Sequence, residues 1–283
     1  MKLKNAGLDS VIRNAITVTD TMSLLEAREV LLKHRVGRLP VLDKNKKPVG
    51  IVTEKDFVRA IYKFGGKMVD KILVRDFMSK DLITITKKNT IHDCAKLMQS
   101  HKISSVLVLE GNRLIGIITK TDLASVFLTQ SVAPLKVSQI MTKDVISVMP
   151  ADSLLLVESL LVKHRISRIV VQRNKKPVGI ITNRDFIPAK MPRWIRDWAD
   201  PKEVKQYQLS QDEFKMNQLS YILSFRAEDI MTANPATIDS DEQVSSAVLI
   251  MIRNGISGLP VVKNGNLCGI ITKSDIVRAI STQ

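Results

Sequence analysis

Cysteines, aromatic side chains and long apolar runs are all scarce in this chain of 283 residues. Its two cysteines, Cys94 and Cys268, belong to no CxxC or Cys/His cluster, which argues against a disulfide framework or a zinc site and indicates core thiols in a reducing compartment. No apolar stretch approaches the roughly 18 residues that would span a bilayer, and the N-terminus has no apolar signal-peptide core. We therefore expect a cytoplasmic protein that does not bind a membrane.

Catalytic constellations are also missing from the sequence. No Ser-His-Asp, Cys-His or paired-carboxylate arrangement can be argued beyond chance. His34, His101 and His164 recur at one position, but each falls in a different repeat without a carboxylate or cysteine at ligand spacing, so capping of helix C-termini is favoured over zinc binding. The sequence predicts a protein that is not an enzyme and has neither catalytic residues nor a metal or catalytic cofactor.

Acidic residues are outnumbered, since 43 Lys and Arg face 28 Asp and Glu and leave a net charge of +15. Such a balance favours anionic partners: nucleotides, nucleic acid or the acidic face of another protein. Many of the lysines are scattered singly in expected turns, and no aromatic residues alternate with them as a surface for stacked bases would require. Nucleic acid is therefore the weaker candidate partner.

One heptad is written four times, as GIVTEKD, GIITKTD, GIITNRD and GIITKSD. Its first half reads as a strand, and its Thr and Asp have the side chains that cap the start of a helix. In a single copy, such a pair is most often a simple cap. Four regular copies indicate a repeated unit. The corner between strand and helix also suits a phosphorylated ligand that bears hydroxyl groups, because the free N–H groups and the helix dipole favour an anion.

The repeated unit has the order β-α-β-β-α. A short strand with a central hydroxyl comes first, then a helix, which in the first unit has Leu24, Ala27 and Leu31 on one face. Two strands joined by a hairpin turn follow, and the closing helix begins at the signature heptad. A core of 60 to 65 residues rarely folds alone, so we expect unit 1 to pair with unit 2 and unit 3 with unit 4.

This pattern resembles the CBS domain, named for cystathionine β-synthase, in four tandem copies that form two Bateman modules. The Ile-Met or Phe-Met pairs at Met78, Met141 and Met231 belong to the same resemblance. It implies an α+β fold and covers almost the whole chain. The expected divisions are CBS domains at 8–66, 70–130, 134–188 and 225–283, with an insertion at 189–224.

The resemblance implies a regulatory sensor of adenine nucleotides (AMP, ADP or ATP), similar in layout to the gamma subunits of AMP-activated protein kinase. In that family, the signature Asp accepts hydrogen bonds from ribose, the signature Thr lies toward the ribose phosphate, and first-strand hydroxyls line the base pocket. The matching ribose residues are Asp56, Asp122, Asp185 and Asp275 with Thr53, Thr119, Thr182 and Thr272. The matching first-strand residues are Thr17, Thr84, Ser147 and Thr237.

The four repeats differ most at the expected phosphate end. Arg38 and Arg168 match the arginine that contacts phosphate from a neighbouring domain in the kinase subunits, and the planar fork of an arginine can meet two phosphate oxygens. The second and fourth repeats have Ser105 and Gly258 there. We therefore expect fewer than four strong nucleotide sites. The alternative is that these arginines only cap a helix end or stay solvated.

The 189–224 insertion differs from the rest of the chain because it contains both tryptophans, Trp194 and Trp198. These residues either anchor the insertion to the third domain or form a docking surface for an unidentified protein partner. Two other functions stay open: a basic interaction or nucleic-acid-binding protein with vestigial clefts, and a sensor of S-adenosylmethionine. The sequence leaves a homodimer open as well.

Overall fold

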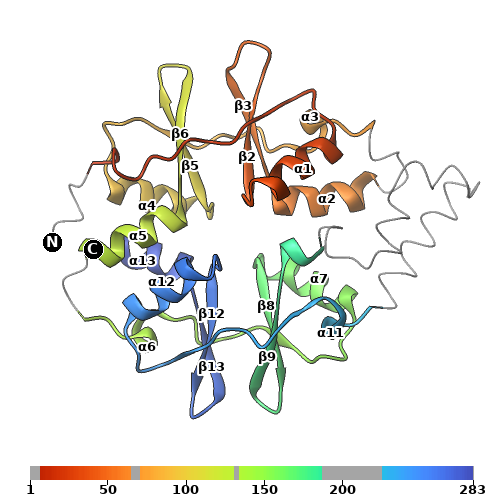
Figure 1. Cartoon of the computed structure of the whole chain (residues 1–283), viewed down its shortest axis with the longest axis vertical. Coiled ribbons are helices and arrows are strands. Elements are labelled where there is room, and N and C mark those ends of the chain that lie inside the picture. The colour runs from red at the N-terminus through yellow and green to blue at the C-terminus, as the bar shows by residue number, and fades with distance from the viewer. Residues whose placement is uncertain (1–6, 65–70, 131–133, 187–224, 283) are drawn as a thin grey trace, which may run out of the picture.

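The computed structural model describes residues 7–64, 71–130, 134–186 and 225–282, which contain four copies of one α+β unit, here called domains 1 to 4 (Figure 1). Domain 1 comprises β1 (Val18–Thr19), α1 (Leu24–Lys33), β2 (Arg38–Leu42), β3 (Pro48–Thr53) and α2 (Glu54–Phe64). Domain 2 comprises β4 (Thr84–Ile85), α4 (Ile91–Ser100), β5 (Ser105–Glu110), β6 (Arg113–Thr119) and α5 (Lys120–Gln130).

The second half of the chain repeats this order. Domain 3 comprises β7 (Ser147–Val148), α7 (Leu154–Lys163), β8 (Arg168–Arg173), β9 (Lys176–Thr182) and the 3-10 helix η3 (Asn183–Phe186). Domain 4 comprises β11 (Ile238–Asp239), α12 (Val244–Arg253), β12 (Gly258–Lys263), β13 (Asn266–Thr272) and α13 (Lys273–Ser281). The closing helix expected in domain 3 is described only as far as η3. The 189–224 insertion with its two tryptophans lies outside the described residues.

In every domain, the first strand is parallel to the second, which pairs antiparallel with the third through the predicted hairpin. The first strands of domains 1 and 4 begin at Val18 and Ile238, so Thr17 and Thr237 directly precede them. Thr84 and Ser147 lie within theirs.

Local sequence explains where the helices begin and end. Helix α1 starts with a capping box in which Ser23 and Glu26 bond to each other's backbone N–H groups, and its buried residues are the predicted Leu24, Ala27 and Leu31. The helices α1, α4 and α7 all end at the recurring histidine, which occupies the C-cap position; these residues are His34, His101 and His164. No group of three or more potential metal ligands occurs among the described residues.

A short segment before each domain crosses to the neighbouring domain, and we call these four segments leads. They are residues 7–13, 71–79, 135–142 and 225–233, with the short helices α3 (Val74–Phe77), α6 (Val137–Ile140) and α11 (Ala227–Ile230) and the strand β10 (Thr232–Ala233). The lead of domain 1 pairs with domain 2 and the lead of domain 2 with domain 1, and domains 3 and 4 exchange theirs in the same way. The exchange confirms the predicted pairing of 1 with 2 and of 3 with 4.

The exchanged leads explain why the signature heptad opens with glycine. A Cβ added to Gly50 would overlap the sulfur of Met78, and the same holds for Gly179 with Met231 and for Gly269 with Met141. At Gly116, Ile12 of the first lead takes the place of the methionine. The Phe-Met and Ile-Met pairs noted in the sequence are therefore packing partners of the glycines in the neighbouring domain.

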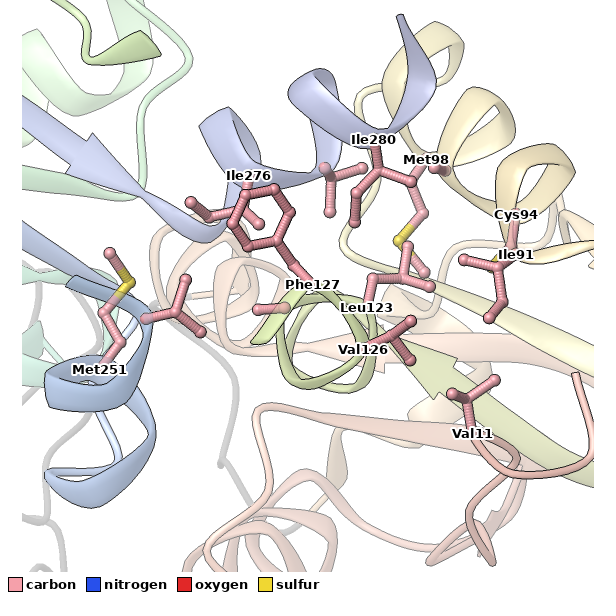
Figure 2. Close-up of a cluster of buried hydrophobic side chains, with 14 of the residues drawn as sticks. Val11, Ile91, Cys94, Met98, Leu123, Val126, Phe127, Met251, Ile276 and Ile280 are labelled. Atoms are coloured by element: carbon pink, nitrogen blue, oxygen red, sulfur yellow. The ribbon is translucent and has the colours of Figure 1, made fainter. Parts of the chain in front are cut away.

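The two pairs pack through their helices, while their hairpins point outward in opposite directions (Figure 1). Helix α13 of domain 4 contacts α4 and α5 of domain 2, and α12 contacts α5. One buried cluster runs through domains 2 and 4; it includes Phe127, Met98, Met251, Ile276 and Ile280 (Figure 2). Domains 1 and 3 have separate buried clusters, and α2 contacts η3 between them. Among the described residues, every helix is too short or too polar to serve as a membrane span.

Candidate functional site

The signature heptad forms the same corner in all four domains. The backbone N–H and the hydroxyl of the threonine both donate to one carboxylate oxygen, Oδ2, of the aspartate three residues later. The N–H distances are 2.8, 2.8, 2.7 and 2.8 Å and the hydroxyl distances 2.6, 2.6, 2.8 and 2.7 Å in domains 1 to 4. The capping that the sequence predicts is therefore present, and it uses only one of the two carboxylate oxygens.

All four signature aspartates are buried, with exposed fractions of 2 to 8%. Contacts of the other oxygen, Oδ1, differ between domains 2 and 4. Arg13 Nε lies 3.2 Å from Asp122 Oδ1, and Asp275 Oδ1 accepts from Thr142 Oγ1 at 3.2 Å and from Arg278 Nη2 at 2.7 Å. A buried carboxylate with a remaining oxygen suits two adjacent hydroxyl donors, as in a ribose.

The hydroxyl residues at the first strands are each followed by a buried apolar residue, such as Val18 after Thr17 and Ile85 after Thr84. For Thr84 and Ser147, which lie within their strands, strand alternation directs the hydroxyl away from the domain core. Thr17 and Ser147 are half-buried, whereas Thr84 and Thr237 are exposed. The Ser147 hydroxyl accepts from Gln172 Nε2 at 2.6 Å.

The two predicted phosphate arginines lie where the domains meet. Arg38 pairs in register with Thr53, and Arg168 pairs in register with Thr182, so each begins the strand beside its own signature threonine. Burial lowers the pKa of Arg38, and the carboxylates Glu54 and Asp122 offset part of that effect. The charge of Arg38 therefore interacts with that of Glu54 in its own domain and with that of the signature aspartate of domain 2, its partner in the pair.

Arg168 crosses in the same way to domain 4. Burial lowers its pKa to about 10, and the carboxylates that act against this are Glu54 and Asp275. A Cβ on Gly258 would lie 2.7 Å from Arg168 Nη1. Gly258 occupies the arginine position of the fourth repeat, and its lack of a side chain leaves the space in which the arginine of the third repeat lies.

Two lysines join these arginines, and sequence reasoning missed both. Lys120 and Lys273 follow the signature threonines of domains 2 and 4, and they contact the opposite domain reciprocally: Lys120 Nζ donates to Ser274 Oγ at 2.8 Å and Lys273 Nζ to Thr121 Oγ1 at 3.0 Å. The available signal was their place at the first position of a helix, where the helix dipole disfavours a cation. A lysine there in two repeats indicates a role outside its own helix.

The four cations Arg38, Arg168, Lys120 and Lys273 form what we call the central basic cluster. Burial lowers the pKa of Lys120 to about 8, with the charges of Arg38 and Arg168 adding to the effect and Asp275 opposing it. Burial, with Arg168 and Arg38 again adding and Asp122 opposing, lowers the pKa of Lys273 to about 8. Arg38 Nη1 is buried without a hydrogen-bond partner among the described residues. An anion with several oxygens would satisfy this atom and offset the repulsion between the cations.

Domains 1 and 3 meet through the same positions of their signature heptads with different chemistry. Arg184 donates from Nε to Glu54 Oε1 at 2.6 Å, and its Nη2 lies 2.6 Å from the same oxygen. The side chain of Arg184 is 42% exposed and that of Glu54 is 22% exposed. Glu54 is also the carboxylate whose charge acts on Arg38 and Arg168 of the central basic cluster. Arg184 thus binds a carboxylate that interacts with the cluster.

The geometry agrees with comparisons to known proteins. The model of the CBS domain matches residues 8–63, 74–129, 137–191 and 227–282. An uncharacterised protein of Methanocaldococcus jannaschii, MJ1225, is 26% identical over 94% of this chain and 95% of its own length.

Two solved structures cover nearly the entire chain. The MJ1225 structure, described as that of a candidate archaeal homologue of the kinase gamma subunit, has a TM-score of 0.82 at 24% identity and covers 97% of this chain and 99% of its own. An uncharacterised conserved protein of Pyrococcus horikoshii has a TM-score of 0.61 at 18% identity and covers 99% of this chain and 100% of its own. At these identities, the structural likeness concerns the fold.

Proposed function

This chain belongs to the CBS-domain family, and we propose that it is a regulatory protein that binds adenine nucleotides between the domains of each pair and signals their presence to a protein partner. The observation that carries the proposal is the central basic cluster, in which Nη1 of Arg38 is buried and finds no hydrogen-bond partner in the described part of the chain. Nucleotide phosphate is an anion of the right chemistry for these guanidinium and ammonium groups.

Each cleft is proposed to divide a nucleotide between two domains. The signature aspartate accepts from the ribose hydroxyls, and the first-strand hydroxyl residues Thr17, Thr84, Ser147 and Thr237 line the base pocket. The phosphate meets an arginine from the paired domain. On this basis, the strong sites are the clefts of Asp122, served by Arg38, and of Asp275, served by Arg168.

The cluster also favours nucleotides over the two other candidates. S-adenosylmethionine carries a cationic sulfonium and no phosphate, so it would add a positive charge near four cations. Nucleic acid requires cations at the surface, whereas Arg38 and Arg168 are among the groups whose pKa values are lowered by burial. We propose no catalytic role, and steady ATP turnover that is abolished by a change at a signature aspartate would overturn that view.

Titration calorimetry with AMP and adenosine tests the assignment of the arginines. Arg38→Ala and Arg168→Ala should each weaken AMP by roughly tenfold to over a hundredfold, because a charge-assisted hydrogen bond contributes about 1.5–3 kcal/mol. Adenosine has no phosphate and should be affected much less. The matched control is Arg173→Ala, which removes an exposed arginine at the hairpin of domain 3.

Two results would contradict the proposal. Equal weakening of AMP and adenosine would mean that the arginines support the fold of the cleft and do not contact phosphate. Four equivalent AMP sites that respond to neither change would return both arginines to a structural role. Gly258→Ala adds an independent check, because the new Cβ must displace the Arg168 guanidinium and should weaken AMP without removing a charge.

A further inference from the structure

The four leads have one structurally equivalent position that differs in side chain. In each lead, this residue pairs with the isoleucine that follows a signature glycine of the neighbouring domain. The pairs are Arg13 with Ile117, Ser79 with Ile51, Thr142 with Ile270 and Thr232 with Ile180. The backbone register is the same in all four, so a comparison at this position concerns only the side chain.

In domain 2, this side chain is a cation on the signature aspartate. Arg13 Nε donates to Asp122 Oδ1 at 3.2 Å, while Oδ2 of the same carboxylate is used by the Thr119 cap. In domain 4, Thr142 Oγ1 donates to Asp275 Oδ1 at the same distance of 3.2 Å. Arg278, one turn further along α13, also donates to that oxygen from Nη2, at 2.7 Å. Domain 2 has Ser125 in the place of Arg278, so its cation comes from the lead.

The two side chains offer a ligand different chemistry. A threonine hydroxyl can accept a hydrogen bond as well as donate one, so it can share Asp275 with a ribose hydroxyl. A guanidinium only donates. Oδ1 of Asp122 and Oδ1 of Asp275 each accept from a guanidinium, that of Arg13 and that of Arg278, so the two clefts differ in the lead residue: Thr142 can also accept from ribose, whereas Arg13 cannot. The Arg13 side chain is 63% exposed and that of Asp122 is 11% exposed, so the arginine can leave toward solvent while the carboxylate stays in place.

We propose that Arg13 is a specificity-determining residue of the domain 2 cleft, where it competes with a ribose diol for Asp122. The inference rests on the proposed function, because it assumes that the signature aspartates receive ribose. Because Arg13 only donates and Thr142 can also accept, the clefts of Asp122 and Asp275 are unequal for adenosine, although a phosphate arginine is proposed for each.

A reciprocal exchange of side chains tests the inference, with adenosine as the calorimetric probe because it does not engage the phosphate arginines. Arg13→Thr should tighten one adenosine site by about two- to fivefold, the range expected for breaking a partly exposed ion pair. Thr142→Arg should weaken the Asp275 site by a similar factor. Arg13→Lys keeps a donor-only cation and should behave as the unchanged protein, and Arg113→Thr removes an exposed charge from the same domain as a control.

Salt provides a second readout, because a direct ion pair is screened. The advantage of Arg13→Thr over the unchanged protein should shrink between about 0.05 and 0.5 M NaCl. An unchanged or weakened adenosine isotherm in Arg13→Thr overturns the inference, as does tightening in Arg13→Lys. If neither the unchanged protein nor Arg13→Thr binds adenosine, both the proposed function and this inference fail. If only the unchanged protein binds adenosine, the inference about Arg13 fails and the proposed function stands.

Discussion

Domains 2 and 4 share one apolar core, whereas domains 1 and 3 keep separate ones. On the first side, α5 and α13 interlock through buried residues such as Phe127 and Ile276 (Figure 2), and a reciprocal pair of lysine-to-hydroxyl bonds borders them. On the second side, the described side chains that join the domains include the partly exposed Glu54–Arg184 pair. One protein thus uses equivalent elements for a fused interface and for a polar one.

The difference indicates which of the two contacts, between domains 2 and 4 or between domains 1 and 3, can respond to a ligand. Buried apolar area stabilises in proportion to its extent, while an ion pair with exposed partners typically contributes only about 0.2–1 kcal/mol. The charge of Glu54 also raises the pKa of both phosphate arginines against the effect of burial. We expect a phosphate bound at the central basic cluster to change the contact between domains 1 and 3 more than the contact between domains 2 and 4.

The largest expected effect comes from breaking the shared core. Phe127→Ala removes a side chain that is 2% exposed and should lower the free energy of unfolding by about 3–5 kcal/mol. Because α5 and α13 belong to different pairs, the amides of α13 should also lose protection in hydrogen exchange. Urea denaturation and hydrogen exchange measure the two effects.

The matched change on the other side is Phe57→Ala, in the core of domain 1. Phe57 is equally buried and stacks edge-on against Phe77 of an exchanged lead, with 5.4 Å between ring centroids. It should cost a similar free energy but leave the exchange of α13 amides unchanged. Equal loss of α13 protection in both variants would show that the two halves unfold together.

The two lysines that border the shared core should make the free energy of unfolding depend on pH. Lys120 and Lys273 have pKa values of about 8 in the folded protein, below the ordinary value of 10.5. The unfolded chain therefore binds more protons between these values, so stability should rise as the pH increases from about 8 to 10.5. After a discount for solvent screening, we expect about 1 kcal/mol in total.

The measurement compares melting temperatures across this range with those of Lys120→Gln/Lys273→Gln, in which the rise should be absent. The affinity for AMP should change in the opposite direction to stability. It should fall above pH 8, because the phosphate of AMP needs the protonated lysines. A variant with the same pH profile as the unchanged protein would remove the lysines from the explanation.

The smallest expected effect is at the contact between domains 1 and 3. A double-mutant cycle with Glu54→Gln and Arg184→Gln should give a coupling energy of at most about 1 kcal/mol, because both partners keep contact with solvent. The coupling should decline with added salt and change on AMP binding. A value of several kcal/mol would mean that the two sides of the molecule are equally tightly joined.

Much of each domain could be predicted from sequence because its signals are local. Hairpin residues, the period of α1 and the Thr-x-x-Asp cap all act within a few residues of their own position. The pairing of the units also followed from their small size. The crossing of the leads did not, although the recurring methionines and the signature glycines were both visible as separate patterns.

The candidate site was only partly predictable, because its residues meet across domains. Gly258 looked like the loss of a phosphate ligand when the fourth repeat was compared with the first, yet the structure places Arg168 from the third repeat against it. Lys120, Lys273 and Arg13 each depend on a partner more than 100 residues away. The sequence of one repeat contains no information about such partners.

The exchanged leads also determine where this chain can be cut. A fragment from residue 7 to 130 retains both leads and both sheets of the first pair, and the stretch from 134 to 282 spans the same set for the second. A fragment that holds a single domain would lack the methionine or isoleucine that covers its signature glycine and would present an unsatisfied strand edge to solvent. Truncations of this chain should therefore remove whole pairs of domains.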